Sequence, residues 1–452
     1  MALKVGNART YGAITIAPTA TYWNIWNDRG SRAHSDVSIF EPRVKPFFAD
    51  IGQKGFTLGH VARRSHDDIN GKSATVMPLY VSVHPPELFA PPVRWDLVWT
   101  DRGSGAHSDA SIWRPVPPPG YVALGDVCVR GYNAPSLPDY RCVKNGDVRG
   151  HTYVREATIG GCIWNDRGTG SGSSVSLWSI TPPNYPPDNV ERLILGVDTF
   201  VANSNHDKPT RTVYVLDLPA QVTQQNPPSV PVMKSPGMPQ PREFGKVTDH
   251  TVIVPCSVVK DVGLTAGQQV DQTPFYTLER RVSYYCQMHY DNTTGPVQQT
   301  NEQTVTTGVS KTKSEEFSTR TSIGISRTAG ISMQGMEASQ TLNFSIEFGY
   351  SVRYDNTQFE ENSNKWSLSV PPKTAASLWS PRHEIIALRD DGTAVGGQGG
   401  ISFDVESRVY VQYTPPGSAA AAPPSGEATQ QSDISRHVIA GDPNPFGTIA
   451  KR

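Results

Sequence analysis

The residues that could do chemistry form no recognisable active site in this sequence. A GxSxG nucleophile elbow, an HExxH zinc-binding pair and a GxxxxGK[ST] phosphate loop are all absent. Two carboxylate clusters, Asp390–Gly392 and His66–Asp68, have the composition of solvated turns. The histidines do not recur at the spacing of metal ligands. We therefore expect no catalytic residue, no cofactor and no metal ion, and we expect that the protein is not an enzyme.

The most regular polar residues lie in three copies of one short segment. The copies read WNDRGSRAHSDVSIF at residues 26–40, WTDRGSGAHSDASIW at 99–113 and WNDRGTGSGSSVSLW at 164–178. They align without a gap, at spacings of 73 and 65 residues. The D-R-G-S core predicts a tight turn, because Asp accepts local backbone N–H bonds and Gly adopts a positive φ at no steric cost.

A second interpretation of the same aspartates is a binding site. Carboxylates at the rim of each copy would line a shallow polar pocket for the hydroxyl groups of a glycan or for a divalent ion. Ser174 stands where the other copies have a second aspartate, which argues against three equal metal sites. His34 and His107 share the segment and are interpreted as turn residues. The candidate receptor-binding residues are Asp28, Asp36, Asp101, Asp109 and Asp166.

The repeats also predict the elements that position these loops. Three copies within about 200 residues indicate three similar sheets around a pseudo-threefold axis. A unit of about 65–70 residues favours a β-prism over a β-trefoil, whose units are usually shorter. A Leu-Gly pair follows each copy, at Leu58-Gly59, Leu124-Gly125 and Leu195-Gly196.

Residues 317–352 carry the clearest amphipathic pattern. Apolar residues take odd positions in a first arm and even positions in a second, with mostly Ser, Thr, Gly and Asn between them. Period-two alternation indicates strands, and Gln334–Gln340 between the arms lacks it, so a hairpin is predicted. One apolar and one small polar face suit a strand between lipid and a water-filled lumen. The predicted membrane-facing residues are Ile323, Ile325, Ile331, Met333, Met336, Leu342, Phe344, Ile346 and Phe348.

Composition favours β-structure along the whole chain. With Gly 39 and Pro 38 among 452 residues, short strands and turns are expected, and no amphipathic helix longer than two turns. A net charge of −1 gives no electrostatic footprint for nucleic acid. The five cysteines form no CxxC pair, and a disulfide among the first three is allowed but not required. Without a signal-peptide core or a run of 18 apolar residues, a soluble monomer or small oligomer is expected before action.

Changes in composition divide the all-β chain into parts. In the third part, Gln299–Thr321 is rich in Ser and Thr and predicts one long solvated strand. Further strands are predicted at Thr251–Val259, Tyr276–His289 and Ile401–Tyr413. The parts are a threefold-repeat, β-prism-like head at 1–218, a Pro-rich linker at 219–245, an elongated β-sheet domain at 246–415 and a low-complexity tail at 416–452.

Two family resemblances follow from these motifs. The repeats, with PVPPPGYVALGDVCVRG at 115–131 and CVK at 142–144, resemble the plant and fungal domain named after vacuolar protein sorting-associated protein 62, over about residues 1–218. The name does not establish a sorting role. A Ser/Thr strand, an amphipathic hairpin and the V-P-P-x-T turn of KWSLSVPPKTAASLW, at 365–379, resemble the aerolysin-type pore-forming toxins of the epsilon-toxin and mosquitocidal-toxin branch over about 150 residues.

The second resemblance implies a toxin in two parts. The head would bind a cell-surface glycan or glycoprotein, and residues 246–415 would associate with copies of themselves and insert the hairpin into the target plasma membrane as part of a β-barrel. Arg327 fits poorly, because it lies on the odd-numbered face, where a mid-membrane position costs about 2–4 kcal/mol. Either a bulge shifts the register there or the spanning part is shorter.

The alternative function is a non-lytic, lectin-like protein whose head binds carbohydrate and whose β-rich stalk half-buries the hairpin. Alternation does not separate the two, because half-buried strands of soluble sheets have the same period. The Ser/Thr/Gly bias of the polar face and the unpacked Gln299–Thr321 segment favour the pore.

Overall fold

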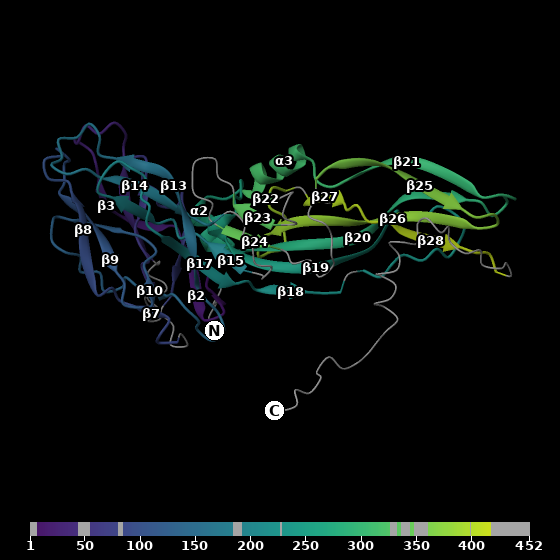
Figure 1. Ribbon diagram of the computed structural model, residues 1–452, viewed down its shortest axis with the longest axis horizontal. Helices are drawn as coiled ribbons and strands as arrows, with labels where there is room; N and C mark the ends of the chain where they lie inside the picture. Colours follow the sequence, from purple (N-terminus) through teal and green to yellow (C-terminus); the bar gives the residue numbers. More distant parts are fainter. Residues whose placement is uncertain are drawn as a thin grey trace, which may run out of the picture.

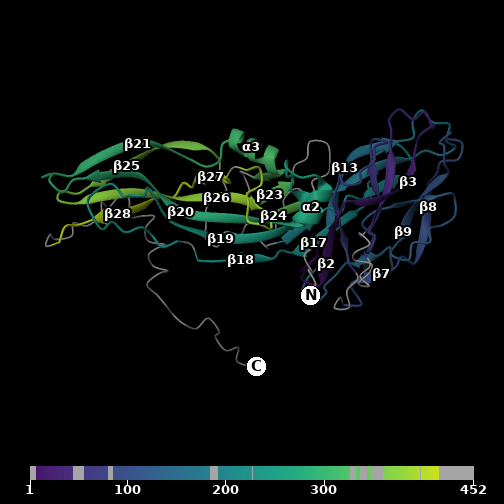
Figure 2. The ribbon, with the colours of Figure 1, turned by 180° about the vertical axis from the view of Figure 1, so that it is seen from behind.

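The protein is an elongated molecule with a rounded head at one end and long strands that run away from it (Figure 1). The view from behind shows the same order, with β19, β20 and β26 along the long axis (Figure 2). The structure, a computed structural model, describes residues 7–43, 55–79, 85–183, 192–226, 228–325, 332–335, 344–347, 360–397 and 399–416. The predicted hairpin residues Ile331, Met336, Leu342 and Phe348 and the tail beyond 416 lie outside these ranges.

In the described residues of the head, the regular elements are all strands. Most are short, and Gly or Pro residues stand in the turns between them, as the composition predicted. The strands are β1 (Arg9–Tyr11), β2 (Ile14–Thr19), β3 (Thr21–Asn27), β4 (Ser38–Arg43), β5 (Val61–Arg63), β6 (Thr75–Pro78), β7 (Phe89–Ala90), β8 (Arg94–Thr100), β9 (Ala110–Val116), β10 (Tyr121–Val122), β11 (Val127–Arg130), β12 (Cys142–Lys144), β13 (Val154–Asn165), β14 (Ser176–Thr181), β15 (Arg192–Leu195), β16 (Phe200–Asn203) and β17 (Val213–Pro219).

The remainder of the chain adds longer strands and two short helices. They are β18 (Val222–Gln224), β19 (Glu243–Pro255), the 3₁₀ turn Cys256–Val258, α2 (Ala266–Gln272), β20 (Phe275–Asp291), β21 (Gln299–Thr307), α3 (Lys311–Thr321), β22 (Ile323–Ile325), β23 (Ser332–Gly335), β24 (Phe344–Glu347), β25 (Asn362–Val370), β26 (Ala375–Leu388), β27 (Ile401–Asp404) and β28 (Val409–Tyr413). The predicted all-β class, with a pseudo-threefold head and an elongated β-sheet body, is confirmed.

The three sequence repeats form three similar antiparallel units in the head. The first unit is β3-β4-β5, the second is β8-β9-β11, and the third is β13-β14-β16 within a larger sheet. Each unit has a register shift in its first strand, two residues before the repeat tryptophan. Such bulges bend a strand and increase its twist, which helps three small sheets close around one axis.

The repeat tryptophans meet at this axis. Trp26, Trp99 and Trp164 are each about 1% exposed, and every pair is T-shaped, with ring centroids 5.7–6.0 Å apart. Edge-to-face pairs of this kind are favourable beyond the area they bury. The indole N–H of each donates to a carbonyl in the next copy: Trp26 to Ser108 at 2.8 Å, Trp99 to Ser173 at 3.0 Å and Trp164 to Ser35 at 2.7 Å. The triad therefore ties each repeat to the next in a closed ring.

The head and the body share one hydrophobic core. Leu58, Leu124 and Leu195, from the three Leu-Gly pairs, lie in the same buried cluster as Val252 and Phe275 of the body. The Tyr11 hydroxyl donates to the Ile253 carbonyl at 2.9 Å across this junction. The body therefore packs directly on the base of the head, although a proline-rich segment connects them in sequence.

The body is a twisted antiparallel sheet of order β18-β19-β20-β26-β27, with β28 paired to the far end of β26. β18 lies within the predicted linker and pairs with β19, so the ends of that segment have regular structure. The predicted strand at Thr251–Val259 is the end of β19 followed by a 3₁₀ turn, and the one at Ile401–Tyr413 is two strands, β27 and β28. The predicted strand at Tyr276–His289 lies inside β20.

The prediction of one solvated strand over Gln299–Thr321 is wrong for its second half. Residues Gln299–Thr307 form β21, but Lys311–Thr321 form α3, a largely polar helix of 11 residues. Ser310 is the N-cap and accepts a hydrogen bond from the Lys313 backbone N–H at 3.2 Å. The prediction failed because Ser and Thr are more common in strands and helix caps than inside helices. Here the burial of Phe317 in the tertiary structure stabilises the helix.

The described parts of the predicted hairpin segment form three short strands in this structure. Residues of its first arm are divided between β22 and β23, which pair with each other so that Ile325 is opposite Met333. β24 then pairs with β23 on one side and with β15 of the head on the other. The segment therefore extends the head's sheet, in the order β16-β14-β13-β17-β15-β24-β23-β22, and does not form part of the body's sheet.

Replacing Trp99 with alanine should destabilise the head by about 3–5 kcal/mol, the usual cost of removing a large aromatic side chain from a core. Trp23 is the matched control because it is 59% exposed and contacts the Arg43 guanidinium across its ring. Trp23→Ala should cost about 1 kcal/mol or less. Urea unfolding measures both, and equal losses would contradict a central role for the triad.

Two buried histidines should make the protein less stable in acid. Burial and the charge of Arg43 lower the pKa of His60 to about 3, and burial and the charge of Arg280 lower the pKa of His383 to about 3. The unfolded chain takes up these protons near pH 6.5, whereas the folded chain does not until about pH 3. Stability should therefore be constant above pH 6.5 and fall below it, by about 1.4 kcal/mol per pH unit for each histidine.

Urea unfolding at pH 7.5, 6 and 5 tests this dependence. His60→Asn keeps an acceptor for the Cys128 N–H, which donates to His60 Nδ1 at 3.1 Å, and should reduce the slope. Replacing the exposed His107 by glutamine should leave the slope unchanged. A stability that is flat between pH 7.5 and 5 would refute the assignment.

Candidate functional site

The repeat loops are built around three buried aspartates. Asp28, Asp101 and Asp166 are 4%, 4% and 6% exposed. The N–H of Val37 donates to Asp28 Oδ1 at 2.9 Å, and the N–H of Val175 donates to Asp166 Oδ1 at 3.0 Å. Each carboxylate thus closes its own loop across nine residues, which is the turn role that the D-R-G-S chemistry predicted.

A ring from the bend that follows the third strand of each unit completes each loop. His66 Nε2 is 2.6 Å from Asp28 Oδ1, and His206 Nε2 is 2.6 Å from Asp166 Oδ1. In the second copy Tyr132 takes this position, where burial and hydrogen bonds with Asp109 and Asp101 raise its pKa to about 12. Burial also raises the pKa of Asp101, against the opposing bonds from the Ala110 N–H and Tyr132. The three loops are therefore alike in shape but not in chemistry.

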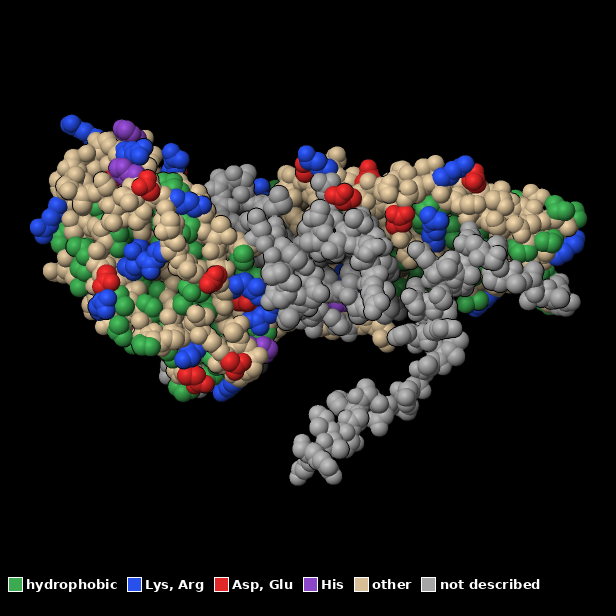
Figure 3. Space-filling view, in the orientation of Figure 1, with side chains coloured by type: hydrophobic (Ala, Val, Ile, Leu, Met, Phe, Trp, Pro, Cys, Tyr) green, Lys and Arg blue, Asp and Glu red, His purple; other side chains and the backbone are tan. Residues whose placement is uncertain are grey.

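A ring of backbone hydrogen bonds joins the three loops. The carbonyl of each repeat arginine accepts an N–H from a neighbouring loop: Arg29 from His107 at 2.8 Å, Arg102 from Gly172 at 3.2 Å and Arg167 from His34 at 2.9 Å. The three arginine side chains are exposed. Arg102 lies over the Tyr132 ring at 4.3 Å, and Arg167 Nε donates to His206 Nδ1 at 3.1 Å. Positive and histidine side chains gather on this part of the head's surface (Figure 3).

The five predicted receptor-binding aspartates therefore divide into two groups. Asp28, Asp101 and Asp166 face inward and are held by protein groups, so they shape the loops and offer no surface to a glycan. Asp36, whose side chain is 63% exposed, and Asp109 are accessible.

One group in the first copy has the composition of a cation site. Single ligand atoms of Asp28, Asp36 and His66 lie within 4.8 Å of one another. Asp28 Oδ1 is already bonded to Val37 N–H and His66, however, and Asp28 Oδ2 accepts from Trp164 Nε1 at 3.1 Å. Because the other copies have tyrosine at the histidine position or Ser174 at the second aspartate position, this group is not repeated.

The second candidate region is the insert between β21 and β25. Of the nine predicted membrane-facing residues, Ile323 and Ile325 are 0% and 7% exposed and belong to the core shared by head and body. Met333 lies in β23, and Phe344 and Ile346 lie in β24. Burying an isoleucine side chain contributes about 1.5–3 kcal/mol, so the shared core holds β22 firmly. Among the described helices none is both long and apolar enough to cross a membrane.

β21 and β25 form a separate two-stranded ladder from which this insert leaves and to which it returns. Thr307 is opposite Asn362 at the end of the ladder that adjoins the insert. One face carries exposed hydroxyl groups, with Thr300 and Ser369 3.0 Å apart and Thr306 and Ser363 2.8 Å apart. The other face buries side chains in a small core that includes Val305, Trp366, Leu368 and Val370.

Comparison with known proteins identifies the first half of the chain. Residues 5–230, half of the chain, match the family model described as vacuolar protein sorting-associated protein 62. The chain belongs to this family. The match covers all three repeats, so the triad and the loops described above are features of a vacuolar protein sorting-associated protein 62 domain. A search of curated proteins finds no match.

Two solved structures show weak similarity. GNIP1Aa from Chromobacterium piscinae is 28% identical over 43% of this chain and 34% of that chain, with a TM-score of 0.31. Cry35Ab1 is 10% identical over 89% of this chain and 90% of that chain, with a TM-score of 0.30. At these TM-scores neither similarity determines the fold or the function of this chain. This family membership therefore rests on residues 5–230 alone.

Sequence reasoning missed two features of the head. The repeat tryptophans were visible as aligned positions, but period alone does not show that three side chains converge on one axis. The second is a pocket formed by Arg114, Arg211 and their neighbours, which no sequence motif marks. All five cysteines are free, and four are buried, so the disulfide that the sequence allowed is not formed.

A glycine pair tests the packing of the loops. Gly168 has φ +93°, and an added Cβ would lie 2.8 Å from the Arg32 carbonyl oxygen and 2.6 Å from the His34 ring. Gly168→Ala should therefore cost about 1–3 kcal/mol of stability, because both the conformation and the contact are unfavourable. Gly172→Ala, with nothing within 4 Å of its added Cβ, should change stability by less than about 0.5 kcal/mol. Thermal or urea unfolding compares the two, and equal effects would contradict close packing of the loops.

Proposed function

We propose that this chain is a β-pore-forming toxin. Its head binds a glycan or glycoprotein on the target cell, copies of the chain associate, and the insert between β21 and β25 refolds into a hairpin that enters the plasma membrane. Before that step the chain is a soluble monomer or small oligomer, and it acts without catalysis, cofactor or nucleic acid. A defensive, insecticidal role rests on the resemblance of its parts to a plant-type domain and to aerolysin-type toxins.

The observation that carries this proposal is the register of the β21–β25 ladder. Gln299 is opposite Val370 and Thr307 is opposite Asn362, with no slip between them. Continued through the insert, the same register places the turn at Gln334-Gly335. It also pairs apolar residues of the two arms with each other, as Ile323–Ile346, Ile325–Phe344, Ile331–Ala338 and Met333–Met336.

Parity makes this register informative. Buried residues of β21 such as Val305 are odd-numbered, and those of β25 such as Trp366 and Leu368 are even-numbered. The apolar residues of the first arm are odd and those of the second arm are even. An extended hairpin would therefore place both stripes on one face. The opposite face, which is mainly Ser, Thr, Gly and Asn with Glu347, would continue the hydroxyl face of the ladder. A slip of one residue would destroy this agreement.

The soluble arrangement is a second pairing of the same residues. In it Ile325 is opposite Met333 and Met333 is opposite Ile346. Releasing Ile323 and Ile325 from the shared core costs about 3–6 kcal/mol in lost apolar burial. Insertion into lipid restores that burial, so the membrane itself supplies the driving force for the change.

When the insert refolds into the membrane hairpin, α3 must change from helix to strand. The amino-acid composition of α3 favours this conversion. Five of its eleven residues are Ser or Thr, which are weaker helix formers than Ala, Leu or Glu. The hydroxyls of Thr319 and Thr321 donate to the carbonyls of Glu315 and Phe317, at 2.8 and 2.7 Å. Hydrogen bonds from a Thr hydroxyl to the carbonyl four residues earlier slightly destabilise a helix, so α3 is only weakly stable.

Self-association follows from the backbone. An isolated hairpin in lipid leaves its outer N–H and C=O groups without partners, at several kcal/mol each. Closure with hairpins of neighbouring copies removes every edge. The first arm from Ile323 to Met333 has 11 residues, which matches the 9–11 residues of a tilted membrane-spanning strand. Arg327 faces lipid in this register, so either a local bulge or a shorter span is required, as the sequence indicated.

A disulfide that ties β24 to the head tests the proposal. Ile194 of β15 is opposite Ser345 of β24, so Ile194→Cys with Ser345→Cys should form a staple in a Cys162→Ser background. The oxidised protein should release less than about a tenth of the dye that the reduced protein releases from vesicles of target-cell membrane, because the insert cannot leave the head. Dye fluorescence and a detergent-resistant oligomer on gels are the readouts.

The matched control is a staple that the refolding does not break. Thr300→Cys with Ser369→Cys joins β21 to β25, whose pairing is the same in both states, and should leave dye release unchanged after oxidation. Equal release by the oxidised and reduced β15–β24 variants would refute release of the insert. No dye release by the wild-type chain on receptor-bearing vesicles, together with carbohydrate binding by the head, would favour the lectin-like alternative.

A further inference from the structure

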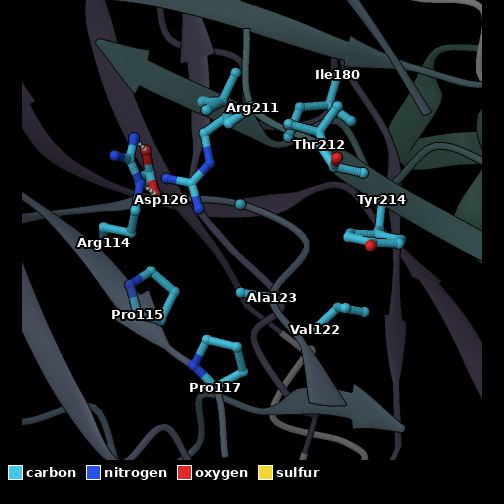
Figure 4. A pocket seen from close by; sticks show the side chains of 13 residues that line it. Arg114, Pro115, Pro117, Val122, Ala123, Asp126, Ile180, Arg211, Thr212 and Tyr214 are labelled. Carbon is cyan, nitrogen blue, oxygen red and sulfur yellow. Dashed lines mark hydrogen bonds and ion pairs between the residues drawn. The ribbon is translucent and has the colours of Figure 1, made fainter. Parts of the chain in front are cut away.

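The head contains a small pocket between the second and third repeats. Its wall is formed by the end of β9, the segment around β10, and the start of β17, with a volume of about 100 Å³ (Figure 4). It lies away from the repeat loops, and none of the five aspartates singled out above lines it. Two arginines and one aspartate are its charged residues: Arg114, Arg211 and Asp126.

The aspartate is fully engaged by the protein. Arg114 Nε donates to Asp126 Oδ1 at 3.1 Å, and Arg114 Nη2 donates to Asp126 Oδ2 at 2.8 Å. The backbone N–H of Ala202 donates to the same Oδ2 at 2.8 Å. One guanidinium and one backbone donor thus satisfy the carboxylate, and Arg114 Nη1 remains for another acceptor.

The second arginine has no such partner. Arg211 is exposed at the rim of the pocket, and its guanidinium points toward Asp126 (Figure 4). In the part of the chain that the structure describes, this guanidinium makes no hydrogen bond and no ion pair. Desolvation and the charge of Arg114 lower the pKa of Arg211, and the charge of Asp126 offsets part of this. The positive charges of Arg114 and Arg211 therefore face the single negative charge of Asp126. A bound anion beside Arg211 would neutralise the remaining positive charge.

The size and walls of the pocket limit what that anion can be. A volume of about 100 Å³ has room for roughly three waters, which suits a carboxylate or sulfate group but not a whole sugar ring. Pro115, Pro117 and Tyr214 supply apolar surface beside the charges, and Thr212 adds a hydroxyl. A ring attached to the anion would rest its C–H face on this surface.

We propose that this pocket binds the anionic substituent, carboxylate or sulfate, of an acidic carbohydrate, with Arg211 and Arg114 Nη1 as donors to the oxyanion. Arginine is suited to this task because its planar donors match two oxygens of one anion. The proposal rests on the receptor-binding half of the proposed function and gives it a place and a ligand class. It does not depend on pore formation.

Saturation-transfer NMR on the full chain tests the site with defined probes. Sialyllactose carries the carboxylate and 6-sulfo-N-acetylglucosamine carries the sulfate, while lactose and N-acetylglucosamine are their neutral counterparts. We expect the wild-type chain to bind at least one acidic sugar and neither neutral one, with inorganic sulfate as a competitor. Arg211→Gln should weaken binding about tenfold or more, because it removes a charge-assisted donor without touching the Arg114–Asp126 pair.

Arg94→Gln is the matched control, because it removes one positive charge, as Arg211→Gln does. Arg94 is 65% exposed, pairs only with Asp96, and does not line the pocket, so affinity should stay within about twofold. Equal binding of acidic and neutral sugars, equal losses in Arg94→Gln and Arg211→Gln, or binding of inorganic sulfate without either acidic sugar would each overturn the proposal. Dye release by the wild-type chain separates the two ideas, because a chain that binds an acidic sugar but releases no dye from receptor-bearing vesicles contradicts pore formation and leaves the pocket assignment standing.

Discussion

The structure depends on shielding the apolar face of the segment between β21 and β25 from water. Residues 323–350 alternate so regularly that one face must be hidden from solvent, and Ile323 and Ile325 of this stripe are buried in a core built jointly by head and body. Ile323 and Ile325 lie with Leu195 and Leu218 of the head and with Val254 and Leu278 of the body. β22 therefore packs where the two parts meet, so a change in the packing of the head can reach it through a single core.

The head combines symmetric structure with unequal chemistry. Three tryptophans, three buried aspartates and three arginine carbonyls repeat with the same geometry around the axis. Their outer neighbours differ, with histidine in two copies and tyrosine in the other. The repeated residues hold the frame together, and differences between copies are free to arise on the surface. Arg114 of the pocket is such a difference, because the aligned positions of the other two copies hold Glu41 and Ser179.

Much of this organisation could be predicted from the sequence, and what could not has identifiable causes. The three-copy alignment predicted the threefold head, and Asp and Gly chemistry predicted the turns. Helix α3 was missed because Ser and Thr read as strand, whereas burial of Phe317 decided the local structure. The pairing of β24 with β15 was missed because contacts between residues some 150 positions apart leave no local pattern. The arginine pocket was missed because no sequence motif marks it.

The uninterrupted ladder of β21 and β25 also limits how this protein can change over time. If the ladder sets the register of the hairpin, the number of residues between Thr307 and Asn362 matters more than the identity of most of them. Deleting one residue from either arm turns that arm's apolar side chains to the opposite face, whereas deleting two preserves the faces. Substitutions among Ser, Thr, Gly and Asn on the polar face would be tolerated, but odd-numbered insertions or deletions within one arm would not. What related sequences would share in this segment is then an even difference in the length of each arm, more than any particular residue.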